Sequence, residues 1–505
     1  MADPRRKFKT TPYAYQLTCL NRFGKWGAFA LLAEMGTGKT WIIINNIADL
    51  WAAGNVDSVL VLAPDGVHTN WVLKEIPKHM PDWVRMRCAA WSSTAKRKDK
   101  QALENLFSVP YDGEVRILTM NWEALQTKRG FEFAEKFSKA SIRLMIVCDE
   151  SDAIKNPSAA RTKALLKLKP YSAYRRIMTG TPINNAPFDA FAQFNFLDES
   201  ILQTTSFYAF KAEYAQMLQP GDRLLDAIKQ KAGTRFTPQV VARDNDGKPI
   251  YRNLDRLAKL IDPYCFRVLK KDCLDLPDKI YKTIYFDLTK EQNAIYKKAK
   301  EECRLVVADN TETSFNKLVS LMKLAQITSG YYTHEFSDGP VRIEGKNPKL
   351  NLLIDRVKKI IESGEKIIIW AKYRVEISDI VSLLIENGIA HVEYHGGVGK
   401  EGRVCAIDRF QTGDAQVFVG NQQAGGTGIT LTAASYMIYF SNNFSLRDRL
   451  QSEDRAHRIG QTKNVTYINL AAKGTIDEVI IDALAKKKNI ADQIVDRAAS
   501  SGYLD

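Results

Sequence analysis

Short apolar runs alternate with segments of helical apolar spacing over the first part of the chain. The runs are typical of strands buried on both faces and lie at 29–33, 58–63, 117–122, 144–147 and 176–178. After the first run, Ile43, Ile47 and Leu50 have the spacing of an amphipathic helix that ends at Gly54. Strands alternating with helices predict a parallel sheet whose ligands bind at the carboxyl ends of the strands.

The same alternation restarts in the second half, with strands expected at 366–370, 391–394, 416–419, 437–440 and 466–468. We therefore predict an α/β fold with two parallel-sheet lobes in tandem, each with a helical insertion. The N-terminal lobe is expected over 1–278 and the C-terminal lobe over 279–505. The expected additions are an insertion outside the sheet at about 188–278, a helical section at about 285–345 and a C-terminal helix at about 476–499.

Basic side chains outnumber acidic ones. The 72 Lys and Arg against 58 Asp and Glu give a net charge of +14. Such an excess favours polyanions, of which nucleic acid is the commonest large one, although a merely solubilising surface is the alternative. The seven cysteines form no C-x-x-C pair, which argues against a zinc ribbon or a disulfide framework and favours a reducing compartment. No apolar stretch approaches the length of a membrane span, so a soluble protein without a membrane partner is expected.

A phosphate-binding turn follows the first apolar run. Gly36 and Gly38 allow successive backbone N–H groups to face an anion at a helix N-terminus. Lys39 would add a charge there, and Thr40 a hydroxyl ligand for magnesium. The strict motif has glycine where this chain has Ala33, and the alternative is an ordinary strand-to-helix turn.

An acidic pair follows the fourth run. Asp149 would hold Mg²⁺ and Glu150 would orient and deprotonate the attacking water, although paired acids also cap helices. Upstream of the phosphate-binding turn, the amide of Gln16 suits the edge of an adenine, since it can donate and accept. Thr179 and Thr181 form a hydroxyl-bearing turn after the fifth run that would couple the nucleotide to a second ligand.

The second half has no phosphate-binding turn of its own. It has a glycine-rich loop at 424–429 and two arginines three residues apart, Arg455 and Arg458, on one helical face. Guanidinium groups there would neutralise charge that develops on a γ-phosphate. The alternative is a pair of surface salt bridges.

Taken together, these motifs resemble those of Swi/Snf-type members of the superfamily-two helicase-like ATPases over nearly the whole chain. The segments that carry the resemblance are 15–16, 34–40, 70–71, 149–150, 155–156, 179–182, 266–271, 275–277 and 451–461, of which DRAHRIGQ at 454–461 is particularly specific. The resemblance implies two RecA-like lobes that bind ATP and Mg²⁺ and move along double-stranded DNA.

The resemblance also implies roles for single residues. Lys39, Asp149, Glu150, Arg455 and Arg458 would be catalytic, with Thr40 and Asp149 as magnesium ligands. The nucleotide would be bound by Gln16, Glu34, Met35, Gly36, Thr37, Gly38, Lys39, Thr40 and Gly428. The DNA backbone would be contacted near Pro64, Asn121, Thr181, Tyr373, His395 and Thr427. Thr179 and Gln451 would couple the two ligands.

Four residues depart from the family pattern. Ser151-Asp152 stands where a small residue and His are usual, Ser441 where an acid is frequent, and Phe444 where Trp is usual. These departures put the strength of coupling in question. No accessory chromatin-reading module fits in the remaining residues, so a minimal prokaryotic or viral form is expected, in the cytoplasm of a prokaryotic or infected host cell.

The sequence therefore predicts an ATP-dependent motor on double-stranded DNA that remodels DNA or DNA-bound protein, working as a monomer. A helicase that separates strands or remodels branches shares every motif, and would bind single-stranded or branched DNA. A nucleotide-gated DNA-binding module that does not travel is the alternative from another class. An RNA-directed motor fits the family pattern less well.

Overall fold

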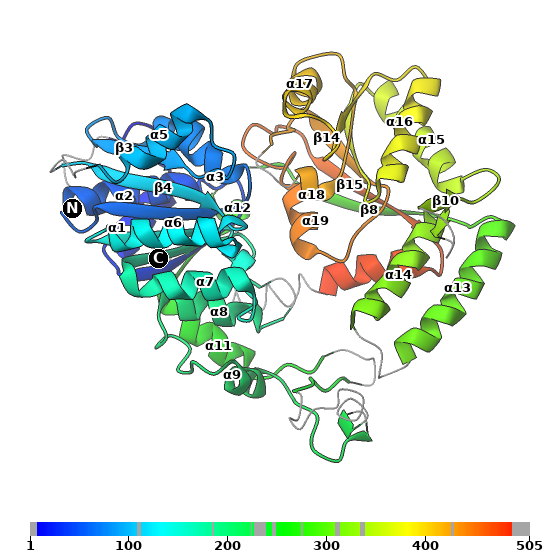
Figure 1. The fold of residues 1–505 in the computed structure, drawn as a ribbon. Coiled ribbons are helices and arrows are strands. Elements are labelled where there is room, and N and C mark those ends of the chain that lie inside the picture. Colours follow the sequence, from blue (N-terminus) through cyan, green and yellow to red (C-terminus); the bar gives the residue numbers. More distant parts are fainter. Residues whose placement is uncertain are drawn as a thin grey trace. The chain divides into compact units, whose positions relative to one another are not determined.

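The computed structural model describes residues 8–108, 113–183, 186–223, 225–226, 239–244, 249–273, 276–308, 314–333, 339–425 and 429–486. The chain divides into two compact units (Figure 1). Unit 1 contains Met1–Gln216 and Ala242–Asp275, and unit 2 contains Met217–Val241 and Leu276–Lys488. Each unit is built around one parallel sheet.

The sheet of unit 1 has seven strands in the described residues, and all its neighbouring strands pair in parallel. Their order across the sheet is β3 (Met86–Ala90), β4 (Val115–Asn121), β2 (Ser58–Ala63), β5 (Leu144–Asp149), β6 (Ser172–Met178), β1 (Ala28–Ala33) and β7 (Cys265–Val268). Strands β5, β6 and β1 are thus neighbours although they are far apart in sequence. Their carboxyl ends lie at one edge of the sheet.

Alternate residues of each strand enter two different cores. In β2, Leu60 and Leu62 pack on one face of the sheet, whereas Val59 and Val61 pack on the other. The first face is covered by α6 (Lys128–Lys139), α7 (Ala160–Leu168) and α8 (Asp189–Leu197), the second by α1 (Ala14–Phe23) and α2 (Lys39–Ala52). Burial of both faces explains why the central strands are continuous apolar runs.

Shorter elements complete unit 1. They are α3 (Val67–Asn70), the π-helix η1 (Trp71–Glu75), α4 (Ile76–His79), α5 (Arg97–Asn105), η2 (Ala124–Gln126), η3 (Ser151–Ile154), η4 (Lys169–Tyr171), α9 (Phe207–Tyr214), α11 (Leu254–Ile261), η5 (Asp262–Tyr264) and α12 (Lys270–Cys273).

The sheet of unit 2 has six parallel strands among the residues described. Their order is β12 (His391–Tyr394), β13 (Val417–Gly420), β11 (Lys366–Trp370), β14 (Ala434–Tyr439), β15 (Val465–Ala472) and β8 (Lys279–Phe286). Helices α15 (Pro348–Glu362) and α16 (Arg374–Glu386) cover one face, where they pack on Ile367 and Ile369. Helix α17 (Lys400–Gln411) covers the other, where it packs on Ile368 and Trp370.

A helical section lies beside this sheet. It comprises α13 (Lys290–Ala308) and α14 (Ser314–Thr328), followed by the antiparallel pair of β9 (Tyr331–Thr333) and β10 (Pro340–Arg342). Two further helices, α18 (Gln422–Gly425) and α19 (Leu446–Glu453), follow β13 and β14. Residues 476–486 are also helical, and their apolar side chains join those of α13, α14 and α19 in one core.

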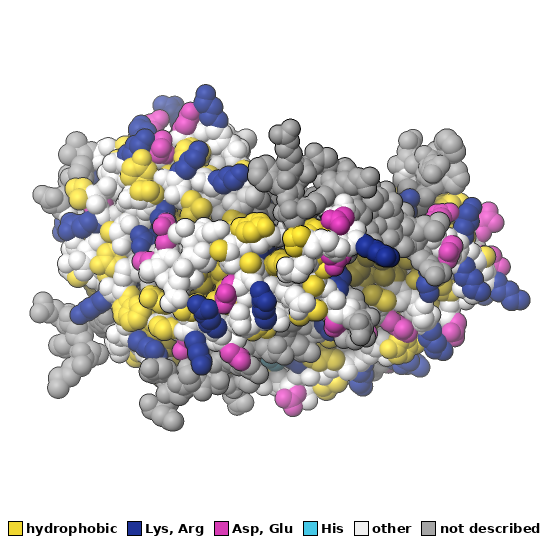
Figure 2. Space-filling view, turned by 90° about the horizontal axis from the view of Figure 1, so that it is seen from below, with side chains coloured by type: hydrophobic (Ala, Val, Ile, Leu, Met, Phe, Trp, Pro, Cys, Tyr) yellow, Lys and Arg dark blue, Asp and Glu magenta, His cyan; other side chains and the backbone are white. Residues whose placement is uncertain are grey.

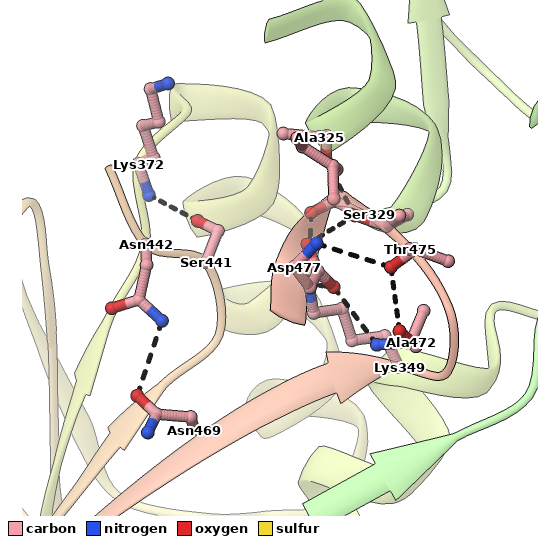
Figure 3. A network of polar contacts seen from close by, with 12 residues as sticks. Ala325, Ser329, Lys349, Lys372, Ser441, Asn442, Asn469, Ala472, Thr475 and Asp477 are labelled. Carbon is pink, nitrogen blue, oxygen red and sulfur yellow. Dashed lines mark hydrogen bonds and ion pairs between the residues drawn. The ribbon is translucent and has the colours of Figure 1, made fainter. Parts of the chain in front are cut away.

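A buried ion pair fastens the helical section to the sheet (Figure 3). The ammonium group of Lys349, at the start of α15, lies 3.3 Å from Oδ2 of Asp477. Thr328, the last residue of α14, donates a hydrogen bond of 2.8 Å to the other oxygen of Asp477. The backbone N–H of Ala472, at the end of β15, also donates to Asp477. Four parts of unit 2 therefore meet at one carboxylate.

The predicted fold class is confirmed, since each unit holds a parallel sheet with helices and every strand expected from the apolar runs is present. The interpretation of 188–278 as an insertion outside the sheet is wrong. Strand β7 pairs with β1, and α8 belongs to the core of unit 1. The division between the units falls between residues 275 and 276.

Other expectations hold only in part. The helical section begins later than expected, because 279–286 form β8 of the sheet, and it ends in the β9–β10 pair. The C-terminal helix is present over 476–486, and the rest of the range predicted for it lies outside the described residues. Among the residues described, no helix combines the length and apolar character that a membrane span requires.

Candidate active site

The turn between β1 and α2 has the backbone of a phosphate-binding loop. Gly36 and Gly38 have φ angles of +80° and +76°, in the left-handed region that glycine adopts without strain. A Cβ atom at Gly38 would lie 2.4 Å from Nε2 of Gln16, so a larger residue there would displace the amide of Gln16 from the loop. The helix that follows has 14 residues and points its N-terminal N–H groups at the loop. This concave backbone fits a phosphate chain.

Lys39 lies inside this loop. Its side chain is buried, and Nζ donates to the carbonyl oxygens of Ala33 at 2.8 Å and Glu34 at 3.4 Å. The hydroxyl of Thr37 donates to the same carbonyl of Glu34 at 2.7 Å. A cation held by neutral carbonyls keeps its full charge available for an anion, which fits the role predicted for Lys39. Thr40 is half-buried at the first turn of α2.

Residues of helix α1 hold the phosphate-binding loop by hydrogen bonds to its backbone. Nε2 of Gln16 donates to the carbonyl oxygen of Gly38 at 3.4 Å, and its Oε1 accepts from the N–H of Tyr13 at 2.9 Å. The hydroxyl of Tyr15 donates to the carbonyl oxygen of Thr37 at 2.6 Å. The structure thus brings Gln16 to the nucleotide loop as expected, with its amide bound to the loop backbone. Its contact with an adenine stays a prediction.

Asp149 ends β5 close to Lys39. Its Oδ2 accepts a hydrogen bond of 2.9 Å from the indole N–H of Trp71, and the indole of Trp122 donates to its backbone oxygen at 3.1 Å. Burial, and then the charge of Glu150, raise its pKa to about 7, while Trp71 and Lys39 oppose the shift. An oxygen ligand set of Asp149 and Thr40, completed by phosphate and water oxygens, fits Mg²⁺.

Glu150 has an unusual backbone conformation. Its φ angle is +50°, which is strained for a residue other than glycine and recurs at functional positions. Its carboxylate accepts a hydrogen bond of 3.4 Å from the hydroxyl of Thr179, at the end of the neighbouring strand β6. That hydroxyl also accepts the backbone N–H of Thr181 at 3.1 Å. A chain of hydrogen bonds therefore leads from the acidic pair to the turn after β6.

Strand β7 also supports the loop. The N–H of Glu34 donates to the carbonyl oxygen of Val268 at 3.0 Å, and the carboxylate of Glu34 accepts from the N–H of Lys270 at 2.7 Å. Sequence reasoning missed this support because it placed the segment outside the sheet. It also missed the roles of Tyr15, Trp71 and Trp122, although Trp71 belongs to one of the motifs, because an indole donor to Asp149 has no signature in one sequence.

The predicted DNA contacts of unit 1 lie farther along the same edge. Pro64 follows β2, Asn121 ends β4 and Thr181 follows β6, and all three are half-buried. Ser151, one of the departures from the family pattern, is buried, and its hydroxyl donates to Oε1 of Gln193 at 2.7 Å. Gln193 in turn donates to the carbonyl oxygen of Pro182 at 2.7 Å. The acidic pair and the turn after β6 are thus linked by a second route.

In unit 2, both predicted arginine fingers lie in the turn after α19, so the expectation that they share one helical face is wrong. Nη1 of Arg455 and Nη1 of Arg458 each lie 3.4 Å from the carbonyl oxygen of Ile429. Arg455 is buried and Arg458 is partly exposed, while Gln451 is buried on α19. Thr427 and Gly428, also predicted as site residues, lie outside the described residues.

The remaining candidates of unit 2 lie at the carboxyl edge of its sheet. Tyr373 follows β11 and caps α16, and His395 follows β12. Nδ1 of His395 accepts the N–H of Gly397, so Nε2 is the nitrogen that donates to Glu393 at 3.3 Å. Ser441 follows β14, where it accepts the N–H of Lys372 (Figure 3). Its hydroxyl donates to Glu376 at 2.6 Å.

Basic side chains are scattered over the face of the molecule that Figure 2 shows. On the face in Figure 2, Lys and Arg are interspersed with Asp, Glu and uncharged residues instead of forming one stripe. Groups of three or more His, Cys, Asp or Glu that would hold a metal ion are absent from the described part of the chain.

Comparison with models of known protein families identifies the family of this chain. The family model of the SNF2-related domain matches residues 22–334. The chain belongs to the SNF2-related family. In this SNF2-related protein, residues 349–460 also match the helicase conserved C-terminal domain. The resemblance inferred from the motifs is thereby confirmed.

Bacterial relatives are similar over nearly the whole SNF2-related chain. It is 25% identical to the putative ATP-dependent helicase/translocase YwqA of Bacillus subtilis over 502 residues, covering 97% of the chain and 49% of the relative. An uncharacterised ATP-dependent helicase of Mycoplasma genitalium is 26% identical over 474 residues, covering 93% and 40%. The chain therefore spans half or less of the length of these curated relatives.

Among solved structures, the SNF2-related chain is similar to the SWI2/SNF2 ATPase core of Sulfolobus solfataricus in complex with double-stranded DNA. The identity is 26%, the TM-score is 0.41, and the match covers 99% of this chain and 96% of the other.

Proposed function

We propose that this SNF2-related protein hydrolyses ATP with Mg²⁺, translocates on double-stranded DNA and thereby remodels DNA or DNA-bound protein. The observation that carries the proposal is the buried Lys39 in the glycine-rich loop after β1, near enough to the buried Asp149 at the end of β5 for its charge to lower the pKa of that carboxyl. A buried cation in a glycine-rich loop, near an acidic pair, is what a nucleotide phosphate and its metal require.

In this proposal, the residues of unit 1 have separate tasks. The N–H groups of the loop and Lys39 bind the phosphates, and Thr40 and Asp149 hold the metal ion, which polarises the phosphate and neutralises its charge. Glu150 orients the attacking water and takes its proton. Thr179 and Thr181 pass the state of Glu150 to the residues that grip DNA.

The residues of unit 2 supply the remaining charge. Arg455 and Arg458 neutralise the transferring phosphate in the transition state, which in comparable enzymes is worth about 10³–10⁵ in rate. Residues at strand ends, among them Pro64, Asn121, Tyr373 and His395, contact DNA phosphates and so confer little sequence preference. DNA and ATP occur together in the cytoplasm of a prokaryotic cell, which is where we place this activity.

The first experiment is steady-state ATP hydrolysis by the purified chain at low salt. Turnover is measured without nucleic acid and then with single-stranded DNA, double-stranded DNA or RNA, and with Lys39→Ala as the inactive control. Stimulation by the duplex above all other ligands supports the proposal. Stimulation mainly by single strands or RNA would point to a strand-separating helicase instead, and turnover that does not depend on duplex length would point to a binding module.

A triplex-displacement assay then tests movement. A third strand placed on the duplex at increasing distance from the loading site should be released with a delay that grows with distance. Release without such a delay would contradict translocation, because a motor needs time to travel.

A further inference from the structure

The turn that carries Arg455 and Arg458 is fastened to the segment by which the chain re-enters unit 2. The chain passes from unit 1 back into unit 2 between residues 275 and 276, so Pro277 and Asp278 lie directly after this crossing. They lead directly into β8, which begins at Lys279. Three side chains contact this entry segment, residues 276–281: Glu453 at the end of α19, and Asp454 and His457 in the turn that follows.

His457 makes the first contact. Its Nε2 lies 2.7 Å from the carbonyl oxygen of Pro277. Since a carbonyl oxygen only accepts, Nε2 must carry the proton and donate. The side chain of His457 is buried, and the residue lies between Arg455 and Arg458 in the sequence. The entry segment is also fixed at the next residue, where the N–H of Val465 donates to the carbonyl oxygen of Asp278 at 3.1 Å.

Glu453 makes the second contact from the last residue of α19. Its Oε2 accepts from the hydroxyl of Tyr281 at 2.7 Å and from Nζ of Lys279 at 3.3 Å. Lys279 also lies 3.6 Å from Asp454. Burial alone would raise the pKa of Glu453, but the charges of Lys279 and Arg449 outweigh it and lower the pKa, so the carboxylate stays ionised.

The other oxygen of Glu453 is fixed within unit 2. Oε1 accepts from Nε of Arg449 at 2.8 Å, and Nη1 of Arg449 donates to Oδ1 of Asn442 and of Asn469 at 2.9 and 2.6 Å. These two asparagines are themselves hydrogen-bonded (Figure 3). Through Arg449, the carboxylate therefore joins the segment after β14 and the middle of β15 to the entry segment.

We propose that Glu453 and His457 are positioning residues, which clamp the turn bearing Arg455 and Arg458 onto the entry segment and so set the place of both guanidinium groups. This inference rests on the proposed function, because it assigns the clamp to the hydrolysis step. A displacement of about 1 Å at a reacting group can cost about 10²-fold in rate. Loosening the clamp therefore lowers kcat while the phosphate-binding loop, and with it KM, is unaffected.

The test compares His457→Ala with His457→Gln, because the glutamine amide can still donate to the carbonyl oxygen of Pro277. His391→Ala is the matched control, since Nδ1 of His391 also bonds a backbone carbonyl in unit 2, that of Ile389 at 2.9 Å. We expect His457→Ala to lower kcat by about 10- to 100-fold, with KM for ATP and the Tm close to those of the control. His457→Gln should recover much of the loss.

Tyr281→Phe provides a milder test of the Glu453 contact, since it removes one hydroxyl and leaves the ion pairs. We expect it to lower kcat severalfold, and to add little to His457→Ala because both act on the same turn. Wild-type kcat in both His457→Ala and Tyr281→Phe would overturn the proposal. Equal losses in His457→Ala and His457→Gln, with wild-type kcat in Tyr281→Phe, would also overturn it.

Hydrogen–deuterium exchange separates this inference from the proposed function. If the wild-type chain hydrolyses no ATP, the proposed function fails, but the clamp can still be measured. His457→Ala should then increase amide exchange in residues 276–281 and 454–458, whereas His457→Gln and His391→Ala should not. Unchanged exchange in all three variants would overturn the clamp itself.

Discussion

The carboxylate of Asp149 has neighbours with opposing effects on its charge. Burial and Glu150 favour its protonated form, whereas the indole of Trp71 and the ammonium of Lys39 favour its ionised form, and the resulting pKa is about 7. A metal ligand must be ionised to bind. The indole N–H of Trp71 therefore has a task that a purely packing residue would not have.

Trp71→Phe should weaken magnesium use in a pH-dependent way. Loss of the hydrogen bond raises the pKa of Asp149 further, so fewer molecules carry the carboxylate at pH 7. We expect the Mg²⁺ concentration for half-maximal turnover to rise several-fold at pH 7. At pH 8.5 the defect should shrink, because the carboxylate ionises as pH rises through its pKa. A defect of equal size at both pH values would contradict this role of Trp71.

Glu150→Gln should separate nucleotide binding from hydrolysis. The amide keeps the size of the side chain and can still bond the hydroxyl of Thr179, but it cannot take a proton from water. We expect turnover to fall by about 10²–10⁴, with nucleotide affinity within a few-fold of the wild type. Binding of a fluorescent ATP analogue and steady-state hydrolysis give the two quantities. Wild-type turnover would remove Glu150 from the role of base.

At the scale of elements, the sequence predicts a strand or helix correctly where its pattern of apolar and polar residues has only one interpretation. An apolar run, two glycines and a helical pattern predict β1, the loop and α2 because local sequence decides their conformation. Strand β7 was not predicted, because it is only four residues long and contains Arg267. Strand β8 was not predicted, because Lys279 and Lys282 interrupt its apolar pattern. The strand lies at the edge of its sheet. Both strands form by pairing with strands that are distant in sequence, and a local sequence pattern does not show such pairing.

The candidate site residues also divide into those that local sequence predicts and those whose role depends on tertiary packing. Lys39, Asp149 and Glu150 could be found because each stands at the end of a recognisable element. Tyr15, Trp71 and Lys270 also lie in motif segments, but the hydrogen bonds by which they support the site could not be predicted, since the place of each element in the sheet or on its face is set by packing.

Gly38→Ala tests the loop as an element. The new methyl group would meet Nε2 of Gln16 at 2.4 Å, and the φ of +76° would be strained. We expect nucleotide binding to be lost, together with about 1–2 kcal/mol of stability. Gly54→Ala is the matched control: its φ is +70°, but its nearest neighbour would lie at 3.9 Å. It should lose similar stability in denaturant titrations and bind nucleotide normally. Normal binding by Gly38→Ala would contradict the assignment of the loop.

At the scale of the whole molecule, the predicted site residues belong to two units with different chemistry. Unit 1 holds the phosphate-binding loop and the acidic pair, and unit 2 holds Arg455 and Arg458. Sequence motifs predicted this division, but the hydrogen bonds that hold the arginine-bearing turn depend on contacts between residues almost two hundred positions apart, such as His457 and Pro277. One sequence does not reveal such pairs.

Arg458→Ala should reduce hydrolysis without preventing DNA binding. The guanidinium group is expected to act on the transition state, so kcat should fall by about 10³-fold or more. DNA affinity at a fixed salt concentration should change little. Arg409→Ala is the control, because Arg409 pairs with Asp414 on the surface of unit 2 and its substitution removes the same charge. Equal turnover in the two variants would remove Arg458 from the reaction.

The ion pair between Lys349 and Asp477 limits how far the chain can be shortened. A truncation made to crystallise the two sheets alone could end the chain after β15, since every strand would be retained. That truncation would leave the ammonium group of Lys349, which is fully buried, without its carboxylate. An uncompensated buried charge costs about 3–5 kcal/mol, a large share of the stability of a typical domain. Any shortened version must therefore extend beyond Asp477.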